Sequence, residues 1–310
     1  MSATINYPER YQYMQQAIAR GFPDRSIDHT QGRIEQLTPL LKNPIQLRTE
    51  YDTWRTIADL LIYLNQGLVR AAEPVGNGNW QDNLWVRYGI RIGFGLGGVV
   101  PTREDEYGLS NTDRPAFPSR RLTEGQNVRI VEGAFARTGN YLGDGVTIMP
   151  PSFVNVGAYV DRGTMIDSKV LVGTCAQIGV DCHLSMDASV GGVIEPPQAK
   201  ACIVSDKVTM FAGTKIAEGV QLEKGVILAM NASLASSIEL HDLVERRQIF
   251  PVNGRLIVPE NAVVIPGSAP IRNSEYAREH GFLKGVALIV KYRDSQTDAK
   301  TIQDELLRVA

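Results

Sequence analysis

Residues 128–148 read VRIVEGAFARTGNYLGDGVTI, and this stretch begins a six-residue repeat that continues to residue 240. Nearly every sixth position is apolar, with one slip of two residues after Val190. The series comprises Ile130, Ala136, Leu142, Ile148, Val154, Val160, Ile166, Val172, Ile178, Leu184, Val190, Val204, Met210, Ile216, Leu222, Leu228, Leu234 and Leu240. A period of six fits neither the period of an α-helix nor that of an ordinary strand.

A second register lies two residues before each of these positions and holds small or β-branched residues such as Val146, Thr164 and Ala188. Glycines, among them Gly157 and Gly213, often stand at the corner position directly before the second register. A short strand with two inward residues, followed by a corner that uses glycine's backbone freedom, is one side of a prism. We therefore predict a mainly β fold, a left-handed parallel β-helix of hexapeptide repeats with about six three-sided coils.

The limits of the repeat predict three domains. Residues 1–120 are expected to form a mostly helical N-terminal domain with a connector, and residues 121–270 the left-handed parallel β-helix. Residues 271–310 are expected to form a short C-terminal strand and helix extension, with the terminal helix at 298–309.

The pattern outside the repeat gives a coarser prediction. Segments 7–20 and 50–71 have helical periodicity, residues 76–98 look like a hairpin or short sheet, and residues 101–121 read as an irregular connector. Residues 191–203 interrupt the repeat as an insertion. Such loops project from the sides of a repeat protein and often bind ligands, although a tolerated surface insertion without a role is the alternative.

The composition excludes several classes of partner. The chain has 310 residues, 43% of them apolar, with 32 basic against 34 acidic side chains and a pI near 6.1. This balance gives no electrostatic reason to expect nucleic acid or an anionic membrane as a partner. The N-terminus lacks the pattern of a signal peptide and no stretch approaches the length of a spanning helix, so we predict a cytoplasmic protein. The three cysteines are expected to be small buried thiols.

Two familiar motifs are weak in this chain. Gly93 to Gly98 match the GxGxxG pattern, but a dinucleotide loop requires a helix directly after the glycines, and the Val-Val-Pro that follows disfavours one. Prisms of the carbonic-anhydrase kind hold zinc through several histidines, whereas His183 is the single histidine in the repeat. We therefore predict neither a nucleotide fingerprint nor a metal site.

The repeat contains long motifs that resemble a known family. They read NVGAYVD at 155–161, GTMID at 163–167, GTCAQIG at 173–179, HLS at 183–185 and GGVIEP at 191–196. These motifs, the helical front and the ending DELLRVA resemble the tetrahydrodipicolinate N-succinyltransferase family. The resemblance implies an acyl-CoA-dependent N-acyltransferase of the lysine and diaminopimelate pathway, which acts on the amine of a small amino-dicarboxylate. It also implies succinyl-CoA or acetyl-CoA as co-substrate and a homotrimer.

The resemblance assigns roles to individual residues. It implies that Arg129 binds a substrate carboxylate, which suits the two-pronged guanidinium. It implies that Asp167 contacts the substrate amine and takes its proton, which suits an amine that must be deprotonated before it attacks a thioester. His183 is the alternative proton acceptor, because its ordinary pKa suits proton transfer near neutrality.

The chain departs from the family pattern at Lys215, where the family has a glutamate. Lys215 is expected to bind an extra carboxylate or phosphate, to polarise the thioester carbonyl, or to be a solvated side chain beside an enlarged pocket. Glu195 and Glu218 are the nearest carboxylates in sequence that could replace the missing one in binding the substrate.

Two further departures are Ser168-Lys169, where the family commonly has Thr-Trp, and Met186-Asp187-Ala188, which replaces a glycine-rich piece. These changes around the acceptor pocket favour an altered substrate or acyl donor. The alternative functions are therefore an acetyl-CoA-dependent relative in a lysine-branch antibiotic pathway of the tabtoxin kind and a non-catalytic scaffold.

The cofactor is expected in a groove along the coils. Most of the residues expected to line this groove are small, which allows close approach of the pantetheine arm. The expected residues are Phe211, Ala212, Gly213 and Ala229. Cations outside the regular coils are candidates for the coenzyme phosphates, namely Arg246, Arg247, Arg255 and Lys291.

Overall fold

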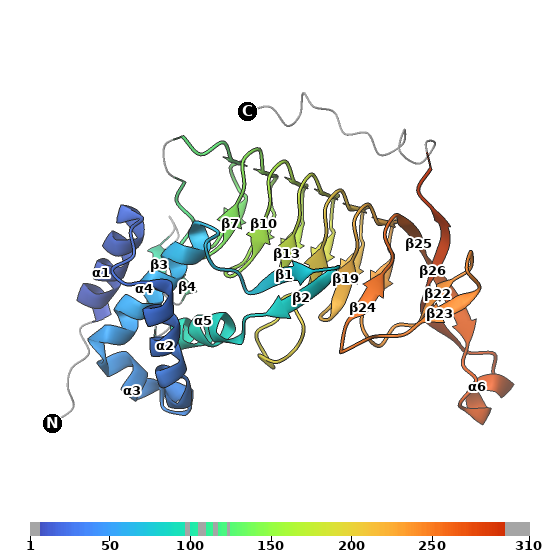
Figure 1. The fold of residues 1–310 in the computed structure, drawn as a ribbon, viewed down its shortest axis with the longest axis horizontal. Helices are drawn as coiled ribbons and strands as arrows, with labels where there is room; N and C mark the ends of the chain where they lie inside the picture. The colour runs from blue at the N-terminus through green and yellow to red at the C-terminus, as the bar shows by residue number, and fades with distance from the viewer. Residues whose placement is uncertain (1–6, 97–99, 105–109, 114–116, 123–124, 295–310) are drawn as a thin grey trace.

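The computed structural model describes residues 7–96, 100–104, 110–113, 117–122 and 125–294. A helical domain stands at one end of a long prism of stacked coils, and an antiparallel hairpin stands at the other end (Figure 1). The prism is a left-handed parallel β-helix, so the predicted fold class is confirmed.

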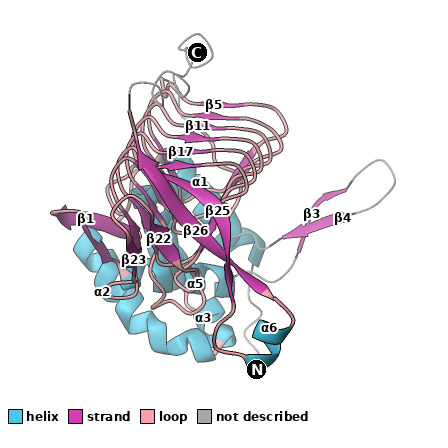
Figure 2. Ribbon diagram, turned by 90° about the vertical axis from the view of Figure 1, so that its right-hand side faces the viewer, coloured by secondary structure: helices cyan, strands magenta, loops and turns pink. Residues whose placement is uncertain are grey.

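Each turn of the chain contributes one short strand to each of three sheets, seen nearly end-on in Figure 2. The first side contains β5 (Arg129–Ile130), β8 (Thr147–Ile148), β11 (Met165–Ile166), β14 (His183–Leu184), β17 (Thr209–Met210), β20 (Ile227–Leu228) and β25 (Ala262–Pro270). The second side contains β6 (Phe135–Ala136), β9 (Phe153–Val154), β12 (Leu171–Val172), β15 (Ser189–Val190), β18 (Lys215–Ile216) and β21 (Ser233–Leu234). The third side contains β7 (Tyr141–Leu142), β10 (Tyr159–Val160), β13 (Gln177–Ile178), β16 (Ile203–Val204), β19 (Val220–Leu222) and β24 (Leu256–Val258).

The inward registers of the sequence form the core of the prism. Parallel pairing places Ile166 opposite both Ile148 and Leu184, and all three side chains are fully buried. Apolar residues of successive coils therefore stack on one another, and each coil covers the core of the next. Gly163 shows why the corners need glycine, because its φ is +69° and a Cβ there would lie 2.2 Å from Oδ1 of Asp181 on the next coil.

The N-terminal domain is built from α1 (Tyr7–Arg20), α2 (Ile27–Leu37), the 3₁₀ helix η1 (Thr38–Lys42), α3 (Pro44–Thr49), α4 (Tyr51–Asn65) and α5 (Leu84–Leu96). Its hairpins are β1 (Ala72–Gly76) with β2 (Asn79–Asp82), and β3 (Val100–Glu104) with β4 (Ser110–Asp113). The helices share one core, in which Trp54, Leu61 and Ile90 are fully buried.

The prediction of a hairpin or short sheet over 76–98 was wrong for its second half, which forms α5. The buried residues of α5 include Val86, Ile90 and Gly93, at helical spacing. Gly89 and Gly93 allow close helix packing, since a Cβ at Gly89 would lie 2.4 Å from Leu60 and one at Gly93 2.6 Å from Phe117. These glycines serve helix contacts, and Gly93 and Gly95 lie in a helix instead of a nucleotide loop. The connector at 101–121 likewise contains strands of the β3–β4 hairpin.

The N-terminal domain covers the third side of the prism. The Arg70 guanidinium lies 3.6 Å from the ring centroid of Tyr159 on β10, and its Nε donates to Oε1 of Gln177 at 2.9 Å. Further along, Nε2 of Gln221 on β19 donates to the carbonyl of Gly78 in the β1–β2 turn at 2.7 Å. The outward side chains of Tyr159, Gln177 and Gln221 therefore contact the N-terminal domain.

The insertion between β15 and β16 is held by a buried cluster around Asp82. Oδ1 of Asp82 accepts from the backbone N–H of Ala201 at 3.0 Å, and Oδ2 lies 2.7 Å from Arg255 and 3.3 Å from Lys200. Arg87 also pairs with Asp82, and its guanidinium donates to the carbonyl of Pro197 at 2.8 Å. Arg87 is 0% exposed and the side chains of Asp82 and Arg255 are 6% and 7% exposed. The insertion therefore joins the N-terminal domain to the prism.

Acid is expected to weaken this joint. Burial by itself raises the pKa of Asp82, but the N–H of Ala201 and the charges of Arg255, Arg87 and Lys200 outweigh it and hold the pKa below the ordinary 3.8. A group with a depressed folded-state pKa contributes stability that is complete above its unfolded pKa and is lost as the pH falls through the folded one. We expect the free energy of unfolding to drop with pH below about 3.8. Urea unfolding at several pH values checks this, and an Asp82→Asn variant should show a shallower pH dependence.

The C-terminal part extends the first side. β22 (Leu240–Asp242), β23 (Arg247–Ile249) and β26 (Leu283–Tyr292) follow β25 in one ten-stranded sheet, and β25 and β26 form an antiparallel hairpin that also contains α6 (Glu275–Glu279) in its connection. The predicted boundary after residue 270 falls in this connection. The helix predicted at 298–309 lies outside the described residues.

Candidate active site

A column of residues runs along the corner between the first and second sides, and we call it the first corner. Each member directly follows a strand of the first side, and its backbone N–H donates to a carbonyl of the next coil. The described members include Met149, Asp167, Ser185, Phe211 and Ala229. Stacked strands are roughly 4.8 Å apart, so neighbouring members of the column are separated by about that distance along the prism axis.

Asp167 lies at this corner with its side chain 39% exposed. Its Oδ1 accepts a hydrogen bond from the backbone N–H of Ser168 at 2.7 Å, which fixes the carboxylate in the turn. Its Oδ2 lies 3.9 Å from Nε2 of His183, whose side chain is 30% exposed. From the sequence, these two residues are alternative proton acceptors. In the structure their side chains are neighbours.

Parallel pairing on the first side explains this contact. Met165 of β11 pairs with His183 of β14, so His183 stands one coil beyond Met165, and Asp167 follows Met165 by two residues. Arg129 of β5 pairs with Thr147, which pairs with Met165. Arg129 therefore lies on the same side two coils away from Asp167, roughly 10 Å along the axis.

The predicted cofactor residues divide into two groups. Phe211 and Ala229 belong to the first-corner column, and Ala212 and Gly213 form the turn after Phe211. At Gly213 the φ is +72° and a Cβ would lie 2.3 Å from Oδ1 of Asn231, so a larger residue would be strained there. These residues share one corner with Asp167, as their register predicts.

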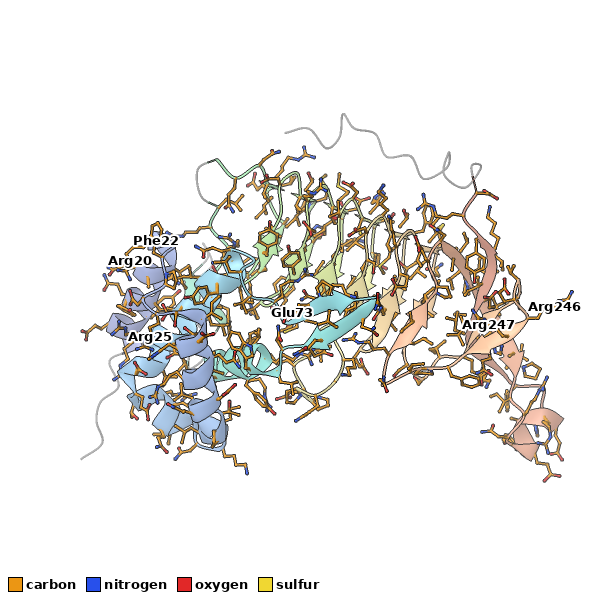
Figure 3. All side chains as sticks on the ribbon, viewed as in Figure 1. Arg20, Phe22, Arg25, Glu73, Arg246 and Arg247 are labelled. Carbon is orange, nitrogen blue, oxygen red and sulfur yellow. The ribbon has the colours of Figure 1, made fainter. Side chains whose placement is uncertain are left out.

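The predicted phosphate-binding cations lie elsewhere. Arg246, in the turn between β22 and β23, and Arg247, the first residue of β23, are exposed beyond the regular coils (Figure 3). Nε of Arg247 lies 4.0 Å from Asp242, and Nζ of Lys291 lies 3.2 Å from Asp294. The expectation for Arg255 was wrong, because this arginine is buried against Asp82 and cannot reach a coenzyme.

The sequence missed a second group of cations that the structure brings together. Lys207 and Lys224 lie in successive turns of the corner between the third and first sides, and with Asn261 and Arg293 they line a cavity of about 350 Å³. The Arg293 guanidinium donates to the carbonyls of Lys207 and Gly225 at 3.2 and 3.3 Å. The six-residue register could have shown that the two lysines share a corner, but the arginine comes from beyond β26.

The remaining predicted substrate ligands lie apart from Asp167 within one chain. Lys215 is exposed on the outer face of the second side, between Ser189 and Ser233 of neighbouring coils. Glu195 lies in the insertion, 78% exposed, with Oε1 3.7 Å from Nη2 of Arg91 on α5. Glu195 thus faces the N-terminal domain in this protomer.

The two further departures from the family pattern lie at the first corner. Ser168-Lys169 and Met186-Asp187 form successive turns there, and the N–H of Asp187 donates to the carbonyl of Ser168 at 3.0 Å. Lys169 and Asp187 have positive φ values of 61° and 62°, as the turn requires. The changed residues therefore adjoin Asp167, and Met186 presents a side chain that is 51% exposed.

The cysteines, potential metal ligands and helices of the described chain complete the comparison with the sequence predictions. Cys175, Cys182 and Cys202 are buried free thiols, as expected, and burial raises the pKa of each to about 12. Among the described residues, no group of three or more His, Cys, Asp or Glu side chains is placed to hold a metal ion. No helix in the same part of the chain is long and apolar enough to cross a membrane.

Comparison with known proteins gives a consistent result. The family model for the N-terminal domain of tetrahydrodipicolinate N-succinyltransferase matches residues 34–96. A 2,3,4,5-tetrahydropyridine-2,6-dicarboxylate N-succinyltransferase of Acinetobacter baylyi is 33% identical over 286 residues, which cover 89% of this chain and 99% of the relative. A protein of the same name from Polynucleobacter asymbioticus is 36% identical over 260 residues, which cover 79% of this chain and 86% of that one.

Hexapeptide coils with this corner, together with these relatives, define the chain as an acyltransferase of the hexapeptide-repeat class. The identity extends through both the helical domain and the prism. The chain belongs to the tetrahydrodipicolinate N-succinyltransferase family.

Proposed function

We propose that this enzyme transfers an acyl group from a coenzyme A thioester to the amine of a small amino-dicarboxylate, in the cytoplasmic lysine and diaminopimelate pathway. The names of its relatives support succinyl as the acyl group. The observation that carries the proposal is the first corner, where Asp167, Phe211 and Ala229 stand in one column. The proposed proton acceptor and the residues proposed to lie along the thioester arm thereby share one surface.

The reaction follows from the groups at this corner. The Arg129 guanidinium holds a carboxylate of the acceptor by paired hydrogen bonds. Asp167 takes a proton from the acceptor amine, the nitrogen lone pair attacks the thioester carbonyl carbon, and the carbon–sulfur bond breaks to release the thiolate of coenzyme A. His183, 3.9 Å from Asp167, is placed to interact with the carboxylate as it becomes protonated.

Backbone N–H groups at the corner are proposed to stabilise the tetrahedral oxyanion. Those of Asp167 and Phe211 already donate to carbonyls of the next coil. The residues that follow Ser185 and Phe211 in the turns, Met186 and Ala212, donate no backbone hydrogen bond within the described part of the chain. Their N–H groups are therefore available to a ligand at the first corner.

The coenzyme phosphates have two candidate positions near the C-terminal coils. One is the exposed pair Arg246 and Arg247 and the other is the cavity lined by Lys207, Lys224 and Arg293. The second position has three cations within one cavity, and we favour it for that reason.

A homotrimer is part of the proposal. Arg129 and Asp167 lie on or beside the first side, whereas Lys215 lies on the second, and all three are at least partly exposed. Adjacent prisms that meet at their open sides would enclose the thioester and bring Lys215 of one subunit toward Asp167 of the next. The site of a single protomer is open to solvent and lacks this second wall.

A donor assay tests the proposal. The protein is incubated with succinyl-CoA or acetyl-CoA and a panel of amino-dicarboxylates, and release of free thiol is followed. We expect thiol release with succinyl-CoA and an analogue of tetrahydrodipicolinate. Preference for acetyl-CoA would contradict the proposed acyl group and support the relative of the antibiotic branch. Absence of thiol release with every pair of substrates would support a non-catalytic scaffold.

Replacement of Lys215 by glutamine tests the charge change. We propose that Lys215 binds a second carboxylate of the acceptor, so the variant should raise KM for the acceptor about tenfold with kcat little changed. Steady-state kinetics with the acceptor varied measure this, and Lys42→Gln, at an exposed position of the N-terminal domain, is the matched control. A loss confined to kcat would assign Lys215 to the thioester carbonyl, and unchanged kinetics would make it a solvated side chain.

A further inference from the structure

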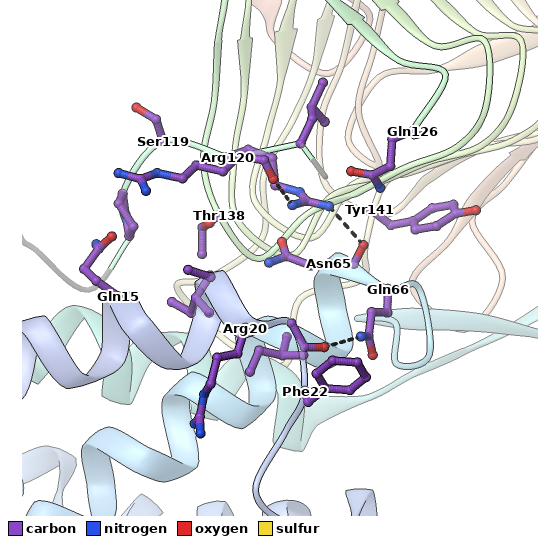
Figure 4. Close-up of a pocket in the computed structure, with 17 residues that line it drawn as sticks. Gln15, Arg20, Phe22, Asn65, Gln66, Ser119, Arg120, Gln126, Thr138 and Tyr141 are labelled. Atoms are coloured by element: carbon purple, nitrogen blue, oxygen red, sulfur yellow. Dashed lines mark hydrogen bonds between the residues drawn. The ribbon is translucent and has the colours of Figure 1, made fainter. Parts of the chain in front are cut away.

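A cavity of about 640 Å³ lies between α1, α4 and the first coils of the prism (Figure 4). Three arginines line it, Arg20, Arg120 and Arg121, and none of its 17 lining residues is an aspartate or a glutamate. Arg20 pairs with Asp24 at 3.3 Å, so the excess positive charge of the lining rests on Arg120 and Arg121. The volume of the cavity falls in the range of small-molecule pockets.

Arg120 is the unusual member of this lining. Its guanidinium donates to the backbone carbonyls of Arg121 and, at 3.4 Å, of Asn65, while its Nε is buried without a hydrogen-bond partner. Burial lowers the pKa of Arg120, and no carboxylate pairs with it within the described part of the chain. Arg120 is partly buried, and a guanidinium that is partly withdrawn from water without a counter-charge is stabilised when an anion completes the site.

Arg87 and Arg255, which are buried, and Arg70, which is partly buried, each have an anionic or aromatic partner. Arg87 and Arg255 share the carboxylate of Asp82, and Arg70 stacks on the ring of Tyr159. Arg120 has only carbonyl partners, and its neighbour Arg121 is exposed at the same cavity. Two arginines that line one cavity and have no carboxylate partner among the described residues suit a ligand with a carboxylate or phosphate group.

The rest of the lining indicates what the anion carries. Ile18, Ile62, Leu122 and Tyr141 supply apolar surface, and Phe22 is 77% exposed at the same cavity. Side-chain amides of Asn65, Gln66 and Gln126 also line the cavity (Figure 4). Oδ1 of Asn65 accepts from the N–H of Gly139 and Nε2 of Gln66 donates to the carbonyl of Gly21, so their other amide atoms are left for a ligand. A ligand with a short hydrocarbon chain and a polar group would match both the apolar and the polar parts of this surface.

We propose that this cavity is a second ligand site, which binds a small organic anion through a carboxylate or phosphate group seated on Arg120 and Arg121. Tyr141 belongs to the third side of the prism, whereas Asp167 lies at the first corner, so the ligand does not occupy the acyl-transfer site. Because the cavity joins α1 and α4 to the first coils, the bound anion links the two domains and stabilises their packing.

The experiment measures thermal unfolding and calorimetric binding of the full chain with glutarate, butyl phosphate, inorganic phosphate and coenzyme A at constant ionic strength. We expect saturable binding of glutarate or butyl phosphate and a rise in Tm with ligand concentration. Stronger binding of glutarate identifies a carboxylate ligand, and stronger binding of butyl phosphate a phosphate ligand. Inorganic phosphate, which has no carbon body, should bind more weakly than butyl phosphate.

Charge reversal locates the site. Arg121→Glu changes an exposed side chain, so the protein should fold, and binding should weaken about tenfold or more. Arg278→Glu, the same change on exposed α6 at the far end of the molecule, is the matched control and should bind like the unmodified protein. Absence of saturable binding by any probe, equal binding by both variants, or competition between coenzyme A and glutarate would overturn the proposal.

Discussion

Asp167→Asn is expected to lower kcat by roughly 10²–10⁴-fold, with little change in the binding of either substrate. Asparagine keeps an acceptor oxygen for the N–H of Ser168, now 2.7 Å from Oδ1, so the turn should be preserved. It cannot take a proton from the acceptor amine. Initial rates at saturating acyl-CoA and acceptor measure the loss.

The matched control for this experiment is Asp181→Asn. Asp181 lies in a turn between the third and first sides with a φ of 55°, a conformation that asparagine also adopts readily, and it has no role in the proposed reaction. Its replacement should leave kcat nearly unchanged. If Asp167→Asn behaved like this control, the proton acceptor would be another group, and His183→Asn would be the variant to measure next.

Asp82→Ala is expected to lower the free energy of unfolding by about 3–5 kcal/mol, because it leaves Arg87 and Arg255 buried without their shared carboxylate. Asp82→Asn keeps an acceptor for the N–H of Ala201 and should lose less. Urea unfolding followed by circular dichroism and by tryptophan fluorescence measures both variants.

Asp144→Ala serves as the control, because Asp144 is an exposed carboxylate in a turn of the prism. Substitutions at such surface positions usually change stability by less than about 0.5 kcal/mol. Equal stability of the Asp82 and Asp144 variants would show that the insertion is held by its apolar contacts, such as that of Ile194 with the N-terminal core, and not by the buried charges.

The prism could be predicted because its period is a local property of the chain. Each strand contributes one inward residue such as Ile166 or Leu184, and the same register that fixes the core also places Asp167 and Phe211 at one corner. The six-residue register alone shows which residues belong to the first-corner column. This part of the candidate site could therefore be predicted from the sequence.

The parts that could not be predicted depend on contacts between distant segments. In the sequence, Gly89 and Gly93 favour a strand or a loop. In the structure they lie in a helix, and Leu60 and Phe117 pack closely against them. Arg255 looks like a free surface cation until it is paired with Asp82, 173 residues earlier in the chain. Periodicity carries no information about such pairs, and the cavity around Arg120 was missed for the same reason.

The hairpin of β25 and β26 bears on how these molecules avoid polymerising. A stack of parallel coils has no natural last member, and its terminal strands offer unpaired amide and carbonyl groups to any further strand. In this chain β26 runs antiparallel to β25 and is followed in the sheet by β22 and β23, so the ladder turns away from the coil geometry. A further coil therefore cannot pair with β25 on the first side, and this side does not offer its last parallel strand for end-to-end growth.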